Sequence, residues 1–189
     1  ELGNLTLTLY RNDRHREVLF SAADAYASAR VYLERPGGGR IECPFDGQEP
    51  RCPGANLPLR PEWHELKFAP RRCLWMHPPG GPTRLVAEFP TVPMGTRLAV
   101  EGGTIWEHAP RHEPSLTTTH VGVDQLGTDR RLMELAIPPG REGVQRADTP
   151  AAGLPSPSAL KLWVQSDNPE ARETCVDFYS LGASAAEGP

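Results

Sequence analysis

Hydrophobic and polar residues alternate along this chain in short segments that end in proline, glycine or other turn-forming residues. In residues 5–10 (LTLTLY) the alternation is strict, so the leucines share one face and the threonines the other. This pattern predicts a half-buried strand. Similar runs predict further strands at residues 63–68, 73–76, 85–89, 96–100, 104–106, 117–124, 131–137, 160–166 and 174–179.

The central stretch, residues 72–93, holds two of the most apolar runs. CLWM (73–76) and LVAEF (85–89) flank the breaker HPPGGP (77–82), which is too rich in proline and glycine to form a helix. We expect the two runs to be neighbours in an antiparallel pair.

Residues 18–35 fit two structures. The alanine-rich part can open a short helix with Ser21 as its N-cap, or residues 29–34 can pair with 40–43 across the turn at 36–39. We favour the hairpin for the second half, and at most one short helix near 21–29. Residues 44–61 and 141–158 predict long loops, the second one mobile, and the glycines at 102–103 predict an interrupted strand.

Composition supports a fold of many short strands. The 189 residues include 21 prolines and 18 glycines, and this frequent punctuation disfavours long helices. One core is the default at this length. We therefore predict an all-β, jelly-roll-like antiparallel β-sandwich with long loops, forming one domain over residues 1–180 and a disordered tail over 181–189.

Charge and hydropathy exclude several classes of partner. The chain has 20 basic and 24 acidic residues and no long basic block, so nucleic-acid binding has no electrostatic support. No stretch of about 18 apolar residues predicts a transmembrane helix. The chain begins at Glu1, close to a predicted strand, with no initiating methionine or signal peptide. We interpret it as a mature form or an excised domain, whose missing part could include a membrane anchor.

Four cysteines allow three disulfide connectivities, and the sequence does not choose among them. Cys43 and Cys52 enclose a polar loop that a disulfide would pin. Cys73 and Cys175 lie in apolar runs that are far apart in the sequence. They either form a disulfide between adjacent strands or remain buried thiols. A zinc site competes, but no Cys-x-x-Cys pair exists. Disulfides would indicate an extracytoplasmic location: periplasm, secreted medium or cell surface.

The order of the strands suggests a family. RCLWMHP (72–78), then LVAEFPTVPMG (85–95) and GGTI (102–105), and the ending from LWVQSDNP (162–169) to CVDF (175–178), resemble galactose-binding-like jelly rolls. This architecture is found in carbohydrate-binding modules and in extracytoplasmic domains of bacterial cell-surface or glycan-handling proteins. The resemblance covers residues 62–180 and implies recognition of a glycan. The calcium site common in such folds has no matching acidic loop here.

The loop at 106–112 (WEHAPRH) is the most chemically dense stretch. Sugar rings stack on aromatic planes, while their hydroxyls need fixed polar partners. Trp63 and Trp106 lie at the ends of predicted strands, beside polar residues, and are the better candidates for stacking. We place Trp75 and Trp163, which lie within apolar runs, in the core. The predicted ligand-binding residues are Trp63, Trp106, Glu107, His108, Arg111 and His112.

Metal and catalytic interpretations have weaker support. His108 and His112 are four residues apart, but Pro110 between them means that a shared helical face cannot be assumed. Together with His120 they could form a histidine-rich metal site. We favour the alternative, a solvated loop with two surface histidines. No G-x-S-x-G motif occurs. The carboxylates in or beside predicted strands are Glu88, Asp124, Glu134 and Asp177. Their spacing does not indicate two carboxylates that face each other across a cleft, as a glycosidase needs. We therefore assign no catalytic residue, and the sequence requires no cofactor.

These observations favour a non-catalytic, extracytoplasmic binding or accessory module that engages a glycan or a cell-envelope component through the loop at 106–112. Two alternatives remain open. One is a structural or protein-interaction domain excised from a larger, membrane-anchored envelope protein. The other is a metal- or carboxylate-dependent hydrolase, which requires a metal or a carboxylate pair in a cleft.

Overall fold

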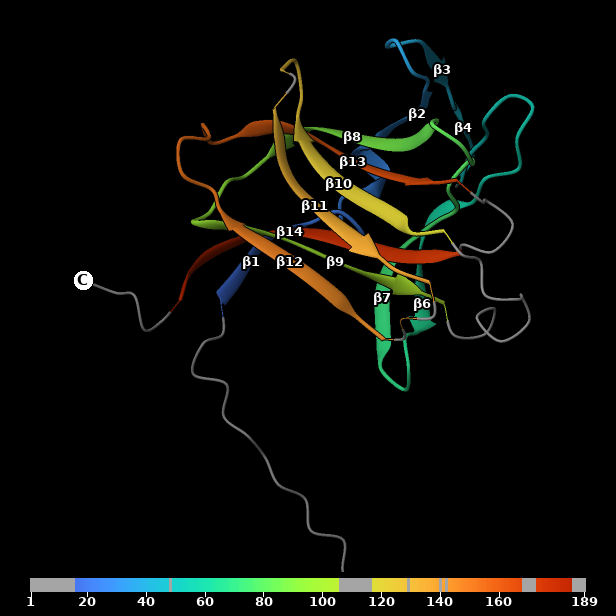
Figure 1. The fold of residues 1–189 in the computed structure, drawn as a ribbon. Helices are drawn as coiled ribbons and strands as arrows, with labels where there is room; N and C mark the ends of the chain where they lie inside the picture. The colour runs from blue at the N-terminus through green and yellow to red at the C-terminus, as the bar shows by residue number, and fades with distance from the viewer. Residues whose placement is uncertain are drawn as a thin grey trace, which may run out of the picture.

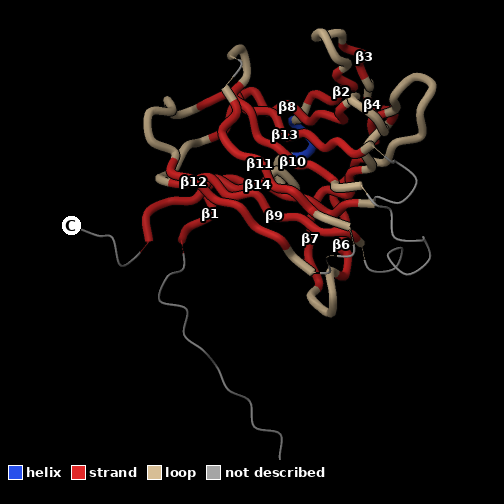
Figure 2. Tube along the Cα trace, in the orientation of Figure 1, coloured by secondary structure: helices blue, strands red, loops and turns tan. Residues whose placement is uncertain are grey.

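The computed structural model describes residues 16–47, 49–105, 117–128, 130–139, 141, 143–167 and 173–184. Strands dominate these residues, as Figure 2 shows, and the helical element among them is the three-residue 3-10 helix η1 (Tyr26–Ser28). Across the described residues, no helix is long and apolar enough to cross a membrane. The all-β class and the short helix within residues 21–29 are confirmed. The strand predicted at 5–10 lies outside the described residues.

The strands are arranged in two large sheets and one small hairpin. In chain order they are β1 (Arg16–Ser21), β2 (Arg30–Glu34), β3 (Arg40–Glu42), β4 (Phe45–Asp46), β5 (Glu49–Pro50), β6 (Leu59–Glu65), β7 (Pro70–Met76), β8 (Arg84–Val92), β9 (Arg97–Thr104), β10 (Thr119–Gln125), β11 (Arg131–Ile137), β12 (Gln145–Pro150), β13 (Ser158–Ser166) and β14 (Thr174–Ser184).

The two large sheets pack face to face as a β-sandwich (Figure 1). Sheet A has the order β12-β9-β14-β7-β6, with β1 also paired to β14, and sheet B has the order β11-β10-β13-β8-β2-β3. The strand pairs are antiparallel. One edge of β14 pairs with β9, and the other is shared by β7 and β1.

Alternate residues of the strands in the two large sheets point into the core between the sheets. Three aromatic rings, those of Phe20, Phe89 and Phe178, form its centre, with centroids 5.1 to 5.7 Å apart. Two of these contacts are edge-to-face, a geometry worth about 0.5–1.5 kcal/mol per pair beyond the buried area. Because Phe20 belongs to β1, Phe89 to β8 and Phe178 to β14, the cluster joins the two sheets.

The expected pairing of the two central runs is wrong. β7 pairs with β6 and β14 in sheet A, whereas β8 pairs with β2 and β13 in sheet B. The breaker at residues 77–82 therefore carries the chain from one sheet to the other. Proline and glycine dictate that the chain turns there, but they do not dictate which strand becomes the partner. The expected hairpin of β2 with β3 is confirmed.

Three expectations about loops also change. β9 runs without interruption through Gly102 and Gly103, where an added Cβ would lie 2.9 Å from Val176 Cγ1 and 2.6 Å from the Gly143 oxygen, so close approach explains these glycines. The predicted loop at 141–158 contains β12, an edge strand of sheet A, and 44–61 contains β4 and β5.

The structure resolves the disulfide connectivity. Cys43 bonds to Cys52 and closes the loop that contains the β4–β5 hairpin. Cys73 bonds to Cys175 and joins β7 to β14 across 102 residues of sequence. The expectation of disulfides is confirmed, because all four cysteines are paired.

Candidate functional site

The outer face of sheet B buries aromatic side chains on the side facing away from the core. Trp163, Val86 and Tyr32 are neighbours on β13, β8 and β2, and they form a separate hydrophobic cluster. Each is at most 1% exposed. The sequence predicts Trp163 to be a core residue; it is buried, but on the outer face of sheet B, because the apolar residues beside it in the chain point inward.

Rows of charged and amide residues flank this aromatic row on both sides and cover it. One row contains Asp124, Lys161, Glu88 and Arg30 on β10, β13, β8 and β2. The other row contains His120, Gln165, Arg84 and Glu34 on the same four strands. Long polar side chains can cover apolar surface with their stems while their polar ends stay in water.

The indole of Trp163 fits its place because the neighbouring residue is a glycine. A Cβ on Gly122 would lie 2.0 Å from Cζ2 of the indole, well inside van der Waals contact. Two guanidinium groups cover the ring: the carbon Cζ of Arg84 is 4.1 Å from its centroid and that of Arg131 is 4.6 Å away. Such cation–π contacts hold both arginines in place.

Five charged groups form a chain of alternating sign above the indole. Lys161 Nζ lies 2.9 Å from Glu34 Oε1 and 3.8 Å from Asp124 Oδ2. Beyond these two carboxylates lie the arginines, with Arg84 Nη1 3.4 Å from Glu34 and Arg131 Nε 3.1 Å from Asp124. Both ends of the chain are therefore positively charged.

These groups line a trough of about 510 Å³. Its walls are the turn after β2, with Arg35–Gly38, and the turn after β10, with Thr128. Figure 1 shows both hairpins rising from the body of the molecule at the top of the view. The charged and amide side chains that line the trough are Glu34, Arg35, Arg84, Asp124, Arg131, Lys161 and Gln165.

At the rim of the trough, Glu134 accepts a hydrogen bond from Arg131 and lies 2.7 Å from Nδ1 of His120. Burial opposes its ionisation, but the hydrogen bonds and charges of these two neighbours lower the pKa of Glu134. His120 is thus paired with a carboxylate. Across the described residues, no group of three or more histidine, cysteine or acidic side chains is placed to hold a metal ion.

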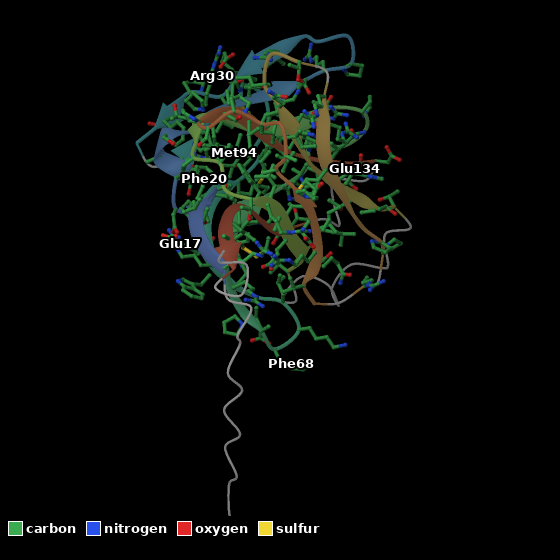
Figure 3. All side chains as sticks on the ribbon, turned by 90° about the vertical axis from the view of Figure 1, so that its left-hand side faces the viewer. Glu17, Phe20, Arg30, Phe68, Met94 and Glu134 are labelled. Carbon is green, nitrogen blue, oxygen red and sulfur yellow. A yellow bond between two sulfur atoms is a disulfide. The ribbon has the colours of Figure 1, made fainter. Side chains whose placement is uncertain are left out.

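Among the predicted ligand-binding residues, Trp63 is the one within the described part of the chain, and it does not line the trough. Trp63 lies on β6, at the edge of sheet A, and is 68% exposed. Phe68, at the β6–β7 turn, is also exposed and lies at the far end of the molecule from Arg30 (Figure 3). The other five predicted ligand-binding residues lie within 106–112, outside the described residues.

A second hollow, of about 680 Å³, lies next to β6. Tyr26, Phe45, Arg60 and Pro61 are among its lining residues, and the rings of Tyr26 and Phe45 are 5.4 Å apart. Pro61 and Trp63 are two residues apart in one strand and so point to the same side. Trp63 therefore lies close to this aromatic hollow at the edge of sheet A.

A buried carboxylate occupies the opposite sheet. Asp177 on β14 accepts hydrogen bonds from Ser21 Oγ at 2.8 Å and from the Ala23 backbone N–H at 3.0 Å. Burial raises its pKa to about 6, although these hydrogen bonds oppose the shift. The carboxylate fastens the end of β1 to β14, which is a structural role.

The fold and the trough together define an antiparallel β-sandwich with a ligand-sized groove on one sheet face. No protein-family model matches the chain, and no curated protein matches it. Among solved structures, the chain is similar to the C-terminal family 22 carbohydrate-binding module of Clostridium thermocellum Xyn10B, with 14% identity over 68% of this chain and 83% of that chain and a TM-score of 0.35.

A xylan-binding domain of the same family is similar at 15% identity, over 84% of this chain and 96% of that chain, with a TM-score of 0.34. The expected resemblance to carbohydrate-binding β-sandwiches is thus found, as a weak likeness. The fold and the trough are established by the strand pairing and contacts of this chain itself.

Proposed function

We propose that this chain is a non-catalytic module that binds a glycan in the trough of sheet B. The observation that carries the proposal is the trough itself, in which fixed donors and acceptors alternate above a buried indole. Sugar hydroxyls both donate and accept hydrogen bonds, so they need partners of both kinds at fixed positions. The volume of about 510 Å³ falls within the range of small-molecule sites.

Stability alone does not account for these charges. The side chains of Lys161, Glu34 and Asp124 are only 10 to 15% exposed. Removing ions from water costs several kcal/mol each, and apolar residues in place of such pairs are often neutral or stabilising by about 1–4 kcal/mol. A preorganised polar array is, however, what recognition of a polar ligand requires.

The proposal includes an extracytoplasmic location. Both disulfides support it, because such bonds persist in oxidising compartments and are rare in the cytosol. Extracellular polysaccharides would also be accessible to the module there.

The test is a polysaccharide binding screen followed by calorimetric titration of the ligands found. Gln165→Ala removes a neutral donor and acceptor of the trough and should weaken binding at least about fivefold, the effect of about one hydrogen bond. Gln145→Ala, on β12 of sheet A, is the matched control and should bind like the parent protein. Retention by no polysaccharide would contradict the proposal.

The same screen separates two alternatives. If Trp63→Ala abolishes binding and Gln165→Ala does not, the ligand stacks on the aromatic edge of sheet A, as the exposure of Trp63 suggests. Release of reducing sugar, lost in Glu34→Gln and Asp124→Asn, would show that the two trough carboxylates act in hydrolysis.

A further inference from the structure

The trough and the whole chain carry charge of opposite sign. The chain has a formal charge of -4. The lining of the trough contains four basic residues and two acidic ones, so it holds an excess of positive charge. A cleft lined by one sign of charge attracts ligands of the other sign, and the effect weakens with salt. The distribution therefore favours an anionic ligand over a neutral one.

The ion pairs within the trough leave this excess in place. Glu34 is shared by Lys161 and Arg84, and Asp124 is shared by Lys161 and Arg131, so two carboxylates serve three bases. Arg131 has a further partner, Glu134 at the rim, whereas the described ion pairs of Arg84 are confined to Glu34. The excess charge is thus greatest at the end of the trough where Arg84 lies.

Arg84 is also held loosely by its polar neighbours. Its contacts with Glu34 and the Gln165 oxygen are 3.4 Å and 3.3 Å long, whereas charge-assisted hydrogen bonds normally measure about 2.7–2.9 Å. Its guanidinium carbon nevertheless lies 4.1 Å from the centroid of the Trp163 ring, a cation–π contact that restrains the group. A planar guanidinium group that is restrained by the ring and has only long contacts to its polar neighbours is suited to bind a carboxylate through two parallel hydrogen bonds.

Arg35 adds a second charge at the same end. It directly follows Glu34 in the wall of the trough and its side chain is exposed. Resting on the proposed function, we infer that the trough takes a uronate-containing, acidic glycan and that Arg84, assisted by Arg35, binds the carboxylate of one sugar. The other polar groups of the trough then serve the hydroxyls.

The test compares polygalacturonate with the same polymer after chemical reduction of its carboxyl groups. The two ligands share their backbone and differ in charge, so their ratio of affinities isolates the carboxylate. We expect the native polymer to bind at least about tenfold more tightly at low ionic strength, and the ratio to shrink at about 0.15 M salt.

Three variants locate the effect. Arg84→Gln should abolish the preference, and Arg84→Lys should keep part of it, because a lysine retains the charge but not the paired hydrogen bonds. Arg35→Gln, whose parent side chain is exposed and does not cover the indole, should reduce the preference even if Arg84→Gln folds poorly. Arg30→Gln is the matched control, because Arg30 lies on the same sheet, paired with Glu42, outside the trough.

The outcomes distinguish this inference from the function on which it rests. Equal binding of both polymers would overturn the acidic ligand and leave a glycan-binding trough. Binding of neither these polymers nor any other polysaccharide would overturn both. Binding of dextran sulfate but not of uronates would overturn the carboxylate in favour of a sulfate. An equal loss in Arg30→Gln would overturn the role of Arg84, since general electrostatic attraction would then explain the preference.

Discussion

Substituting Gly122 by alanine tests whether the place of Trp163 organises the trough. The added Cβ would lie 2.0 Å from Cζ2, 2.2 Å from Cε2 and 2.6 Å from Nε1 of the indole. Carbon atoms in contact are normally about 3.5–4.0 Å apart, so the ring must shift by roughly 1.5 Å or more. The two arginines that rest on it, Arg84 and Arg131, must shift as well.

The cost follows from three contributions. Overpacking a filled site costs about 1–3 kcal/mol. Disturbing two cation–π contacts at half-exposed arginines removes about 0.5–1 kcal/mol each. Replacing glycine by alanine within a strand stabilises the folded state by about 0.5–1 kcal/mol, because the unfolded chain loses conformational entropy. We therefore expect the free energy of unfolding of Gly122→Ala to fall by about 1–4.5 kcal/mol. Glycan affinity should fall with it, because both ends of the charged chain lose their support.

Urea unfolding, followed by the fluorescence of the four tryptophans, measures the stability change. Gly39→Ala is the control, since its Cβ would meet Arg35 Cβ at an ordinary 3.8 Å. This variant should match the parent protein or gain slightly. The argument is refuted if Gly122→Ala stays within about 0.5 kcal/mol of the parent protein, the usual range for surface substitutions, with unchanged fluorescence and unchanged glycan affinity.

Two further predictions concern stability. Replacing Cys73 and Cys175 by alanine should lower the free energy of unfolding by up to about 4.7 kcal/mol, and replacing Cys43 and Cys52 by alanine should lower it by up to about 2.6 kcal/mol. The two losses differ because loop-closure entropy grows with the sequence separation, which is 102 residues for the first pair and 9 for the second. Urea unfolding under non-reducing conditions measures both losses. Between pH 4 and 6, the free energy of unfolding should fall by up to about 3 kcal/mol as pH rises, because the pKa of Asp177 is about 6 in the folded protein against 3.8 ordinarily.

The direction of the pH effect follows from proton binding. Between these two pKa values the native state holds the proton on Asp177 and the unfolded state does not, so the stabilisation is complete below pH 4 and is lost through pH 6. Asp177→Asn should remove this part of the pH dependence. A variant with the same slope as the parent protein would contradict the assignment. For the disulfides, an equal loss from both pairs would contradict the loop-length argument.

Strands with a buried face could be predicted from the sequence, but their partners could not. β11, Arg131–Ile137, matches its expected bounds because its apolar residues alternate. β12, Gln145–Pro150, was missed because it is an edge strand with no fully buried residue, and its sequence QRADTP lacks an apolar alternation. The pairing of β7 with β8 was wrong because strand partners depend on contacts between residues that are distant in the chain.

The trough was beyond sequence analysis for the same reason. Glu34 and Gln165 are separated by 131 positions and meet only because β2, β8 and β13 are adjacent in sheet B. Each polar residue alone has the pattern of an ordinary outward position. Gly122 carries the most useful signal, since a glycine within the alternating run of β10 indicates close approach by another group. The sequence alone does not show that this group is Trp163.

The position of β14 in sheet A sets the order in which the protein can fold. β14 lies between β9 on one edge and β7 with β1 on the other, although it is the last of the described strands in the chain. During synthesis on the ribosome, sheet A therefore lacks its central strand until residues 174–184 emerge. The disulfide between Cys73 and Cys175 likewise cannot form before Cys175 has been synthesised. The chain should consequently complete sheet A only near the end of its synthesis, with most of its strands already made.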